Sequence, residues 1–496
     1  MAKKDSIRVR FAPSPTGRFH IGGARTALYN YLLARQAGGS FILRLEDTDR
    51  KRFNPDSEKE FIDSLHWLGL QWDEGPDIGG PCGPYRQSER RQIYQEHIEE
   101  LIRNGHAYYC FCTPERLAQV RKEQKNRKED PRYDGLCRSL SLEEAKARID
   151  KGEKYVVRFK TPKEGTTTCY DQMRGEIRVE NRTLDDYILL KSNGLPVYHL
   201  AAMVDDHLMG ITHVFRGSEW LPTFPLHVQI YNAYGWEQPL WMHLSLFLNP
   251  TGKGKLSKRQ SNSSSFKAVY TLDLKELGFL PEAINNWIAL MGWSYDDHTE
   301  FFTLQDLIEK FSIEKLNPSP AAVNFTKLDH FNKLHIRALD QDELASRLVP
   351  VFQEAGLDPS FNDIVELMPI LQERLRTLDE AVDIAGFFFT EWKQPSPEEL
   401  VGKKMDESAS LQALRAAHDT LRNLETYNHD DVEARLRELA DSLGLKAGQL
   451  FGILRMAVTS QKVSPPLIES MHVIGYEEVL KRIAESAAIL ERSLTS

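Results

Sequence analysis

The segment 7–36 constrains the fold more than any other part of this sequence. Residues 7–12 (IRVRFA) alternate in polarity and stop before a proline, which predicts a short strand. A turn-forming PSPTG follows, and GGARTALYNYLLAR (22–35) then places its apolar residues on one helical face. FILRLED (41–47) predicts a second strand, and FIDSLHWLGL (61–70) predicts an amphipathic helix. Strand, helix, strand and helix in this order predict an α/β fold with a parallel, doubly wound sheet.

The rest of the chain changes pattern twice. Strand-like runs at 154–162 and 175–181 predict an α+β insertion, and 195–220 returns to buried strand and helix patterns. Beyond about residue 335, apolar residues recur at steps of three or four, which predicts an all-α C-terminal third. Pro369 within this region is expected to start or kink its helix.

Charge and composition exclude several classes of protein. The 496 residues carry 63 Lys and Arg against 72 Asp and Glu, a net charge of −9, which argues against a protein that coats nucleic acid non-specifically. Five cysteines, an odd number, do not form a disulfide framework. The N-terminus lacks an apolar signal segment, and no apolar run approaches the length of a membrane span. We therefore expect a soluble, multidomain, cytoplasmic protein.

Two segments are candidates for binding phosphate. In PSPTGRFHIGG (13–23), a strand leads through a turn of small residues into a helix N-terminus, where backbone donors and the helix dipole favour anions. His20 is a candidate donor to a phosphate oxygen, and Gly22 and Gly23 allow a ligand to approach. The alternative is an ordinary strand–helix turn with a surface histidine.

The second segment is GKGKLSKRQ (252–260). Four of the seven residues 253–259 are Lys or Arg, which suits a loop that clamps a polyphosphate, although a solvated basic loop is the alternative. Neither GxxxxGK[ST] nor GxGxxG occurs, so P-loop and dinucleotide-binding functions lose their main support.

Taken together, HIGG and KLSKR resemble the HIGH and KMSKS signatures of the class I aminoacyl-tRNA synthetases. RVRFAPSPTG, RLEDTDR (44–50), GPYRQSER (83–90) and KLSKR also follow the order and spacing of bacterial glutamyl-tRNA synthetases. The resemblance runs from about residue 7 to the C-terminus. It implies a Rossmann-type class I catalytic core with an α+β insertion, a stem-contact domain and an all-α anticodon-binding domain. The implied boundaries are 1–92 and 198–255 for the two halves of the core, 93–197 for the acceptor-binding insertion, 256–335 for the stem-contact domain with the KLSKR loop, and 336–395 and 396–496 for two helical anticodon-binding subdomains.

The resemblance also implies an activity. Such enzymes use ATP and magnesium to convert L-glutamate into glutamyl-adenylate, and they transfer the glutamyl group to the 3′-terminal adenosine of tRNA(Glu). The first step usually requires the tRNA, and no covalent enzyme intermediate is expected. The family expectation for the oligomeric state is a monomer.

Roles for individual residues follow from the same resemblance. The implied catalytic residues are His20, Lys255 and Lys258. The implied ATP-binding residues are Gly17, His20, Gly22, Gly23, Lys255, Ser257 and Lys258. The implied glutamate-binding residues are Arg10, Ala12, Ser14, Glu46, Tyr198 and Arg216, with Arg10 as the partner of the side-chain carboxylate and Glu46 as the partner of the α-ammonium. Arg374 lies where the family places an anticodon-reading arginine.

Three positions leave alternatives open. Ala202 stands where many relatives have Asn, so a hydrogen bond to the substrate is lost or replaced. Asp205 and Asp206 either face the magnesium or the acceptor end, or are buried partners of basic residues.

A group of cysteines resembles the zinc knuckle of some glutamyl enzymes. Its implied ligands are Cys110, Cys112, Tyr133 and Cys137, and Ser139 stands where some relatives have a histidine ligand. Thiolates suit zinc and tyrosine suits it much less, so a zinc site and free cysteines in a loop remain as alternatives.

Other functions agree less well with the sequence. The helical C-terminal third disfavours a glutaminyl-tRNA synthetase, and its length disfavours a glutamyl-queuosine tRNA synthetase. A catalytically silent tRNA-binding paralogue is disfavoured because His20, Glu46 and Lys258 are all present. A small-molecule nucleotidyltransferase does not account for the long tRNA-contact region. Whether tRNA(Gln) is charged as well remains open.

Overall fold

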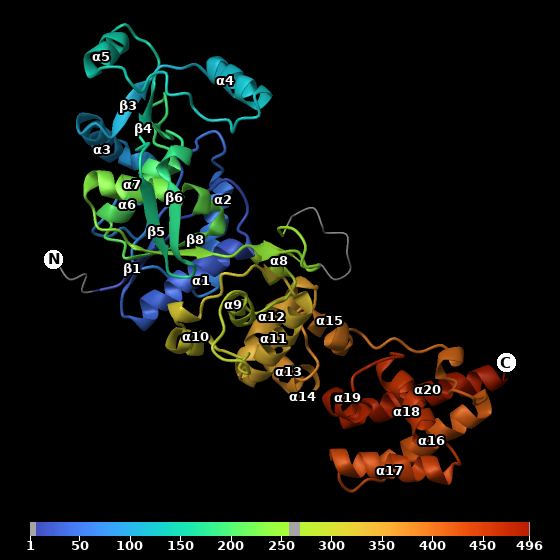
Figure 1. Cartoon of the computed structure of the whole chain (residues 1–496). Helices are drawn as coiled ribbons and strands as arrows, with labels where there is room; N and C mark the ends of the chain where they lie inside the picture. Colours follow the sequence, from blue (N-terminus) through green and yellow to red (C-terminus); the bar gives the residue numbers. More distant parts are fainter. Residues whose placement is uncertain (1–5, 257–267, 496) are drawn as a thin grey trace. The chain divides into compact units, whose positions relative to one another are not determined.

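The chain divides into two compact units. In the computed structural model, which describes residues 6–256 and 268–495, the first unit comprises Met1–Lys275 and Pro281–Leu328. The second unit comprises Glu276–Leu280 and Asp329–Ser496. Figure 1 shows the order of the elements along the chain. The first unit is α/β and the described part of the second is helical, as the sequence predicts.

A six-stranded sheet organises the first unit. Its order is β2-β1-β8-β9-β5-β6, with β6 antiparallel to β5 and the other neighbours parallel. The strands are β1 (Arg8–Phe11), β2 (Ser40–Leu43), β5 (Thr166–Asp171), β6 (Gly175–Glu180), β8 (His213–Gly217) and β9 (Leu240–Leu244). The strand predicted over 41–47 ends at Leu43, and the side chains of Arg44 and Glu46 beyond it form a buried ion pair (3.1 Å).

The first helix begins within the segment PSPTGRFHIGG (13–23). Helix α1 (Ile21–Gln36) packs against β1, β2 and β8, and His20 caps it by accepting a hydrogen bond from the Gly22 N–H at Nδ1 (3.1 Å). Helix α2 (Pro55–Trp67) begins earlier than predicted, because Asn54 caps it and a proline occupies its first turn.

The inserted region contributes to two sheets. Strands β3 (Ala107–Cys110), β4 (Val156–Phe159) and β7 (Ile188–Leu190) form a separate sheet, near which α4 (Pro114–Asn126) and α5 (Leu142–Asp150) are drawn in Figure 1. The hairpin β5–β6 comes from the same stretch of sequence but joins the six-stranded sheet. Asp171, at the end of β5, is thereby brought beside β9.

The remaining elements before residue 340 are mostly helical. They are α3 (Arg91–Arg103), α6 (Tyr198–Leu208), α7 (Phe224–Tyr234), α8 (Thr271–Glu276), α9 (Pro281–Leu290), α10 (Leu304–Lys310) and α11 (Phe325–Ala338), with the short strands β10 (Phe247–Leu248) and β11 (Ala321–Ala322). Helices α6 and α7 pack on each other, and α7 packs on β5. Their apolar side chains share one buried core with the sheet.

The helices from α12 onward belong to the second unit. They are α12 (Gln341–Glu354), α13 (Phe361–Glu366), α14 (Met368–Leu371), α15 (Glu380–Ala385), α16 (Glu407–Arg422), α17 (His429–Ser442), α18 (Ala447–Thr459), α19 (Leu467–Ile474) and α20 (Tyr476–Thr495). Pro369 lies in the first turn of α14, which confirms that it starts a helix. Buried leucines and isoleucines of α16 to α20 form a core of their own.

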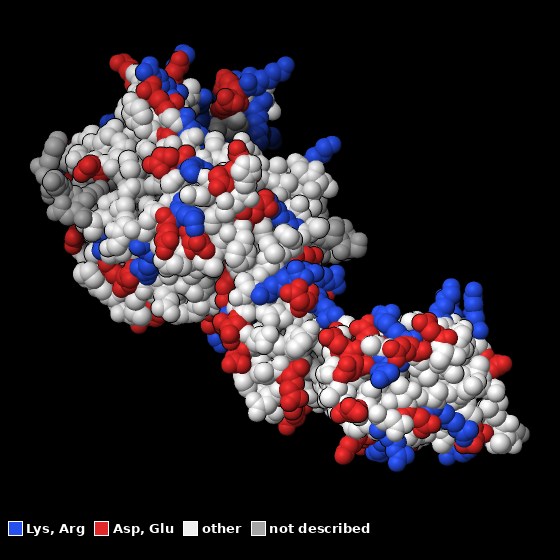
Figure 2. All heavy atoms as spheres, turned by 90° about the horizontal axis from the view of Figure 1, so that it is seen from below, with Lys and Arg blue, Asp and Glu red and all other residues white. Residues whose placement is uncertain are grey.

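The surface charges are mixed. On the face drawn in Figure 2, acidic and basic side chains are interspersed over the C-terminal part of the chain. Any recognition of nucleic acid on that face depends on individual side chains rather than on a broad basic field. Among the described residues, none of the helices is both long and apolar enough to span a bilayer.

Candidate active site

The first cavity, of about 650 Å³, lies at the N-terminus of α1. His20, Gly22 and Gly23 line it, and Lys255 joins them from the KLSKR segment. Because Nδ1 of His20 accepts the capping hydrogen bond, the neutral ring carries its proton on Nε2. The turn therefore combines an imidazole donor with the positive end of a helix, an arrangement that suits an anion.

The glycines of this turn differ in how much room they leave for a side chain. A Cβ on Gly23 would lie 2.9 Å from the Phe19 ring, so close packing requires glycine there. A Cβ on Gly22 would stand 3.4 Å from Nδ1 of His20. Gly17 lines neither this cavity nor the next. Ser257 and Lys258 lie outside the described residues.

The second cavity, of about 820 Å³, collects the residues that the resemblance assigns to glutamate. All six line it, and they come from strands, loops and the start of α6, far apart in the sequence: Arg10, Ala12, Ser14, Glu46, Tyr198 and Arg216. The Tyr198 ring stacks on Trp220 with centroids 3.8 Å apart, which holds one wall in place. Ala202 is fully buried in the core and lines neither cavity.

The two cavities adjoin. Thr26, Gly217 and Glu219 line both of them. Sequence reasoning missed Glu219, although it follows Arg216 within RGSEW, and it also missed Arg25 of the first cavity, whose Nη1 donates to the Met291 carbonyl (2.6 Å). A ligand group at the shared wall can contact groups held in either cavity.

A buried network of charges lies next to the second cavity. Asp205 and Asp206 are both fully buried, and the structure gives them basic and polar partners. Asp206 accepts from Arg10 Nε (2.9 Å) and Arg44 Nη1 (2.8 Å). Asp205 accepts from Arg90, Gln87 and Tyr94 at 2.7, 2.9 and 2.8 Å. Of the two alternatives left by the sequence, the geometry therefore supports buried partners of basic residues.

Glu46 is the acidic group of the second cavity nearest to this network. Its Oε1 lies 3.1 Å from Arg44 Nη2. Burial raises the pKa of Glu46 to about 7, against the attraction of Arg44 and Arg10. A cation bound beside Glu46 would favour its charged form, as an acceptor for an ammonium group requires.

Arg216 differs from the other buried arginines. Its Nε donates to His243 Nε2 (2.9 Å), but neither Nη nitrogen has a hydrogen-bond partner among the described residues, although both are buried. Burial lowers the pKa of Arg216. A buried cation without an anionic partner is costly, so this guanidinium suits an incoming anion.

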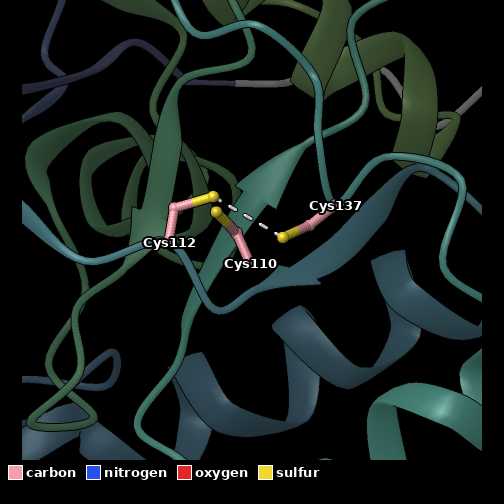
Figure 3. A group of neighbouring side chains, drawn as sticks. All are labelled: Cys110, Cys112 and Cys137. Atoms are coloured by element: carbon pink, nitrogen blue, oxygen red, sulfur yellow. Dashed lines mark hydrogen bonds between the residues drawn. The ribbon is translucent and has the colours of Figure 1, made fainter. Parts of the chain in front are cut away.

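Three cysteines gather in the insertion. The sulfur atoms of Cys110, Cys112 and Cys137 lie within 4.8 Å of one another and point toward a common centre in Figure 3. The Tyr133 hydroxyl lies 3.5 Å from the sulfur of Cys110 and 3.7 Å from that of Cys112, while Ser139 is exposed. Figure 3 marks the Cys112–Cys137 contact of 3.7 Å.

Arg374 lies in the second unit, in a turn directly after α14. Its Nη1 donates to the Ile370 carbonyl (2.7 Å), and the side chain is exposed. Because the residue is exposed and a guanidinium has five N–H donors, it can also donate to a ligand at the surface.

A mostly parallel sheet, a helix-capping histidine at the turn after β1 and two adjoining cavities lined by arginines agree with the catalytic domain of a class I aminoacyl-tRNA synthetase. The family model described as "tRNA synthetases class I (E and Q), catalytic domain" matches residues 6–330. The model described as "Anticodon binding domain" matches residues 343–487. The chain belongs to the glutamate–tRNA ligase family, as the following similarities show.

The chain is 47% identical to the glutamate–tRNA ligase of Roseiflexus sp. (strain RS-1) over 495 residues, which cover 98% of this chain and 97% of that protein. It is 45% identical to the glutamate–tRNA ligase of Chloroflexus aurantiacus, with 98% of each chain covered. Among solved structures, it resembles a glutamate–tRNA ligase from Elizabethkingia meningosepticum in complex with its amino acid, with a TM-score of 0.87 and 36% identity. That match covers 98% of this chain and 100% of the solved one.

Proposed function

We propose that this chain activates L-glutamate with ATP to glutamyl-adenylate and transfers the glutamyl group to the 3′-terminal adenosine of tRNA(Glu), as a cytoplasmic monomer. The observation that carries the proposal is that the two cavities adjoin. Because Thr26, Gly217 and Glu219 line both, a carboxylate held in the second cavity can meet a phosphate held in the first. The full-length similarity to glutamate–tRNA ligases supports the same reaction.

The first cavity is the proposed site of ATP. His20 donates Nε2–H to a phosphate oxygen, Lys255 supplies a positive charge, and the N-terminus of α1 adds its dipole. The roles of Gly17, Ser257 and Lys258 stay as the resemblance implies them. Magnesium bound to the phosphates would neutralise part of their charge. Within the described part of the chain, Glu219 is the one carboxylate that lines this cavity.

The second cavity is the proposed site of glutamate, and two of the arginines that line it, Arg10 and Arg216, take different carboxylates. Arg10 already donates from Nε and Nη2 to Asp206 and from Nη1 to the Phe215 carbonyl. Its positive charge also opposes the effect of burial on Glu46, whose pKa would otherwise be raised further. If Glu46 binds the α-ammonium, the neighbouring α-carboxylate lies near Arg10. Arg216, with both Nη nitrogens unpartnered, then takes the side-chain carboxylate. This assignment reverses the one that the resemblance implies for Arg10.

ATP–pyrophosphate exchange tests the proposed reaction. We expect exchange that requires both glutamate and tRNA(Glu), with no exchange when glutamine replaces glutamate. Exchange without tRNA would keep the adenylation chemistry but contradict the tRNA-dependent first step. No exchange under either condition, with tRNA still bound, would indicate a tRNA-binding paralogue.

The cysteine cluster is the proposed site of a zinc ion. Three sulfurs within 4.8 Å fit thiolate ligands, and Tyr133 is the neighbouring oxygen. Arg116, whose Nη1 lies 3.4 Å from the Cys112 sulfur, would offset part of the negative charge of the thiolates. The ion would act structurally, by tying Cys137 to the β3 end that carries Cys110.

Metal analysis of purified variants tests this site. We expect about one zinc per chain in the unaltered protein and loss of the metal in Cys137→Ser, with a lower melting temperature. The matched control is Cys82→Ser, since Cys82 is a half-buried cysteine outside the cluster. Equal zinc content in the two variants, or none in the unaltered protein, would contradict the proposal.

Arg374 is the proposed reader of the last anticodon base. Arg374→Gln is expected to reduce the preference for tRNA(Glu) over tRNA(Gln) about tenfold or more and to leave tRNA-saturated glutamate activation unchanged. The control is Arg376→Gln, because Arg376 is also exposed but is engaged by Glu380 (2.8 Å). Charging of both tRNAs should be compared by kcat/KM. An unchanged preference in Arg374→Gln would remove this role.

A further inference from the structure

A chain of three side chains leads away from the second cavity. Arg216 on β8 lines the cavity, and its Nε donates to His243 Nε2 at 2.9 Å. His243 on β9 in turn places Nδ1 2.7 Å from Oδ2 of Asp171, at the end of β5. Neither His243 nor Asp171 lines either cavity, and both side chains are fully buried.

The sheet places these residues in line. Arg216 and His243 are direct partners in the parallel pairing of β8 with β9, so their side chains lie on the same face. Asp171 is paired with Trp241, two residues before His243. The Trp241 ring also supports the guanidinium carbon of Arg216, at 4.6 Å from its centroid. Three neighbouring strands therefore hold the arginine from one side.

Asp171 determines which nitrogen of His243 carries the proton. Its Oδ2 accepts from both the His243 backbone N–H (3.0 Å) and Nδ1, so Nδ1 is the protonated nitrogen and Nε2 is the acceptor. Burial lowers the pKa of His243 to about 4, although Asp171 opposes this, and the ring stays neutral at physiological pH. A neutral ring can receive the Nε–H of Arg216 without repelling it.

A neutral histidine and a carboxylate in the position of His243 would affect the charge of Arg216 differently. A carboxylate next to Arg216 would satisfy its charge, as Asp206 does for Arg10. His243 instead fixes the plane of the guanidinium and leaves the charge, and both Nη nitrogens, for a ligand.

We infer that Asp171 and His243 form a positioning pair that orients Arg216 toward a carboxylate of bound glutamate, and that they thereby determine the affinity for glutamate and its preference over glutamine. The inference rests on the proposed function, in which Arg216 contacts glutamate. The pair touches no substrate and takes no part in the chemical step.

Steady-state charging of tRNA(Glu) by single variants tests the pair. His243→Phe keeps a ring but removes the acceptor, and it should raise the KM for glutamate about 10- to 100-fold while the KM for ATP stays within about twofold. His243→Gln offers a carbonyl oxygen to Arg216 and should recover most of this loss. The ratio of kcat/KM for glutamate to that for glutamine should fall with the KM effect, because the glutamine amide does not pair with the guanidinium.

Arg216→Lys serves as the reference that separates this inference from the proposed function. If Arg216→Lys impairs glutamate use and the His243 variants leave the KM for glutamate unchanged, the positioning pair is overturned and the proposed site stands. If Arg216→Lys also leaves that KM unchanged, the contact between Arg216 and glutamate fails, and the inference fails with it.

A merely structural role gives a different result. In that case His243→Phe would lower the melting temperature and the active fraction, His243→Gln would restore no glutamate affinity, and the KM values for glutamate and ATP would stay as in the unaltered protein. If His243→Phe does not fold, Asp171→Asn carries the test, because it keeps the side-chain volume and disturbs the acceptor for Nδ1. A rise in the KM for glutamate of less than about twofold in that variant would overturn the inference.

Discussion

His20→Asn is expected to lower the rate of glutamyl-adenylate formation about a hundredfold or more, with little change in the KM for ATP. The physical reason is that Nε2–H of His20 stabilises charge that develops on the phosphates in the transition state, and the shorter asparagine does not reach them. Asparagine is a good N-cap, so the helix start that His20 now caps through Nδ1 is retained. ATP–pyrophosphate exchange with saturating glutamate and tRNA measures the effect.

Two controls make this result specific. His298→Asn changes an exposed histidine that lines neither cavity, and it should leave the exchange rate unaltered. The melting temperature of His20→Asn should match that of the unaltered protein. A loss of less than about fivefold in a fully folded His20→Asn protein would assign the stabilisation of phosphate charge to other groups.

Arg44→Met is expected to give the largest loss of stability. Arg44 is fully buried and lies between Asp206 (2.8 Å), Glu46 (3.1 Å) and Asp205 (3.7 Å). Its removal leaves carboxylates in the interior with too little compensating charge, which costs about 3–5 kcal/mol of the free energy of unfolding. Urea unfolding followed by tryptophan fluorescence measures the loss.

The same substitution at the surface is the control. Arg127 pairs with Glu129, but both side chains are more than half exposed, so Arg127→Met should leave the unfolding midpoint unchanged. Glutamate affinity should fall in Arg44→Met even where the protein remains folded, because Glu46 loses its nearest cationic partner. Equal midpoints for the two variants would show that water or rearranged side chains satisfy the buried carboxylates.

Much of the site could be predicted from the sequence because its parts are local. The turn PSPTGRFHIGG contains its strand end, its glycines and its capping histidine within one segment. Spacing alone left two predictions, an anion site at a helix N-terminus or an ordinary strand–helix turn, and the structure places the turn at the N-terminus of α1 in the wall of a cavity. The helical period beyond residue 335 is equally local, and the described residues of the second unit confirm it. The resemblance named six residues for glutamate, and the structure brings all six to one cavity.

Other features could not be predicted because they depend on which strands become neighbours. Asp205 and Asp206 look alike in the sequence, yet each has its own set of buried partners. The hairpin β5–β6 lies within the predicted insertion, and only sheet pairing shows that it extends the catalytic sheet.

The sequence by itself determined the α/β and all-α parts of this chain, since turns, caps and periodicity act over a few residues. Its motifs, through their resemblance to the glutamyl-tRNA synthetases, indicated the family and the residue types of the site. Only the tertiary structure decided which carboxylates neutralise which arginines. Arg10, Arg44 and Arg216 have the same chemistry, but the first two lie against Asp206 and the third lies against the neutral His243. The cost of burying a charge depends on the groups within a few ångströms of it, and those groups come from strands far apart in the chain.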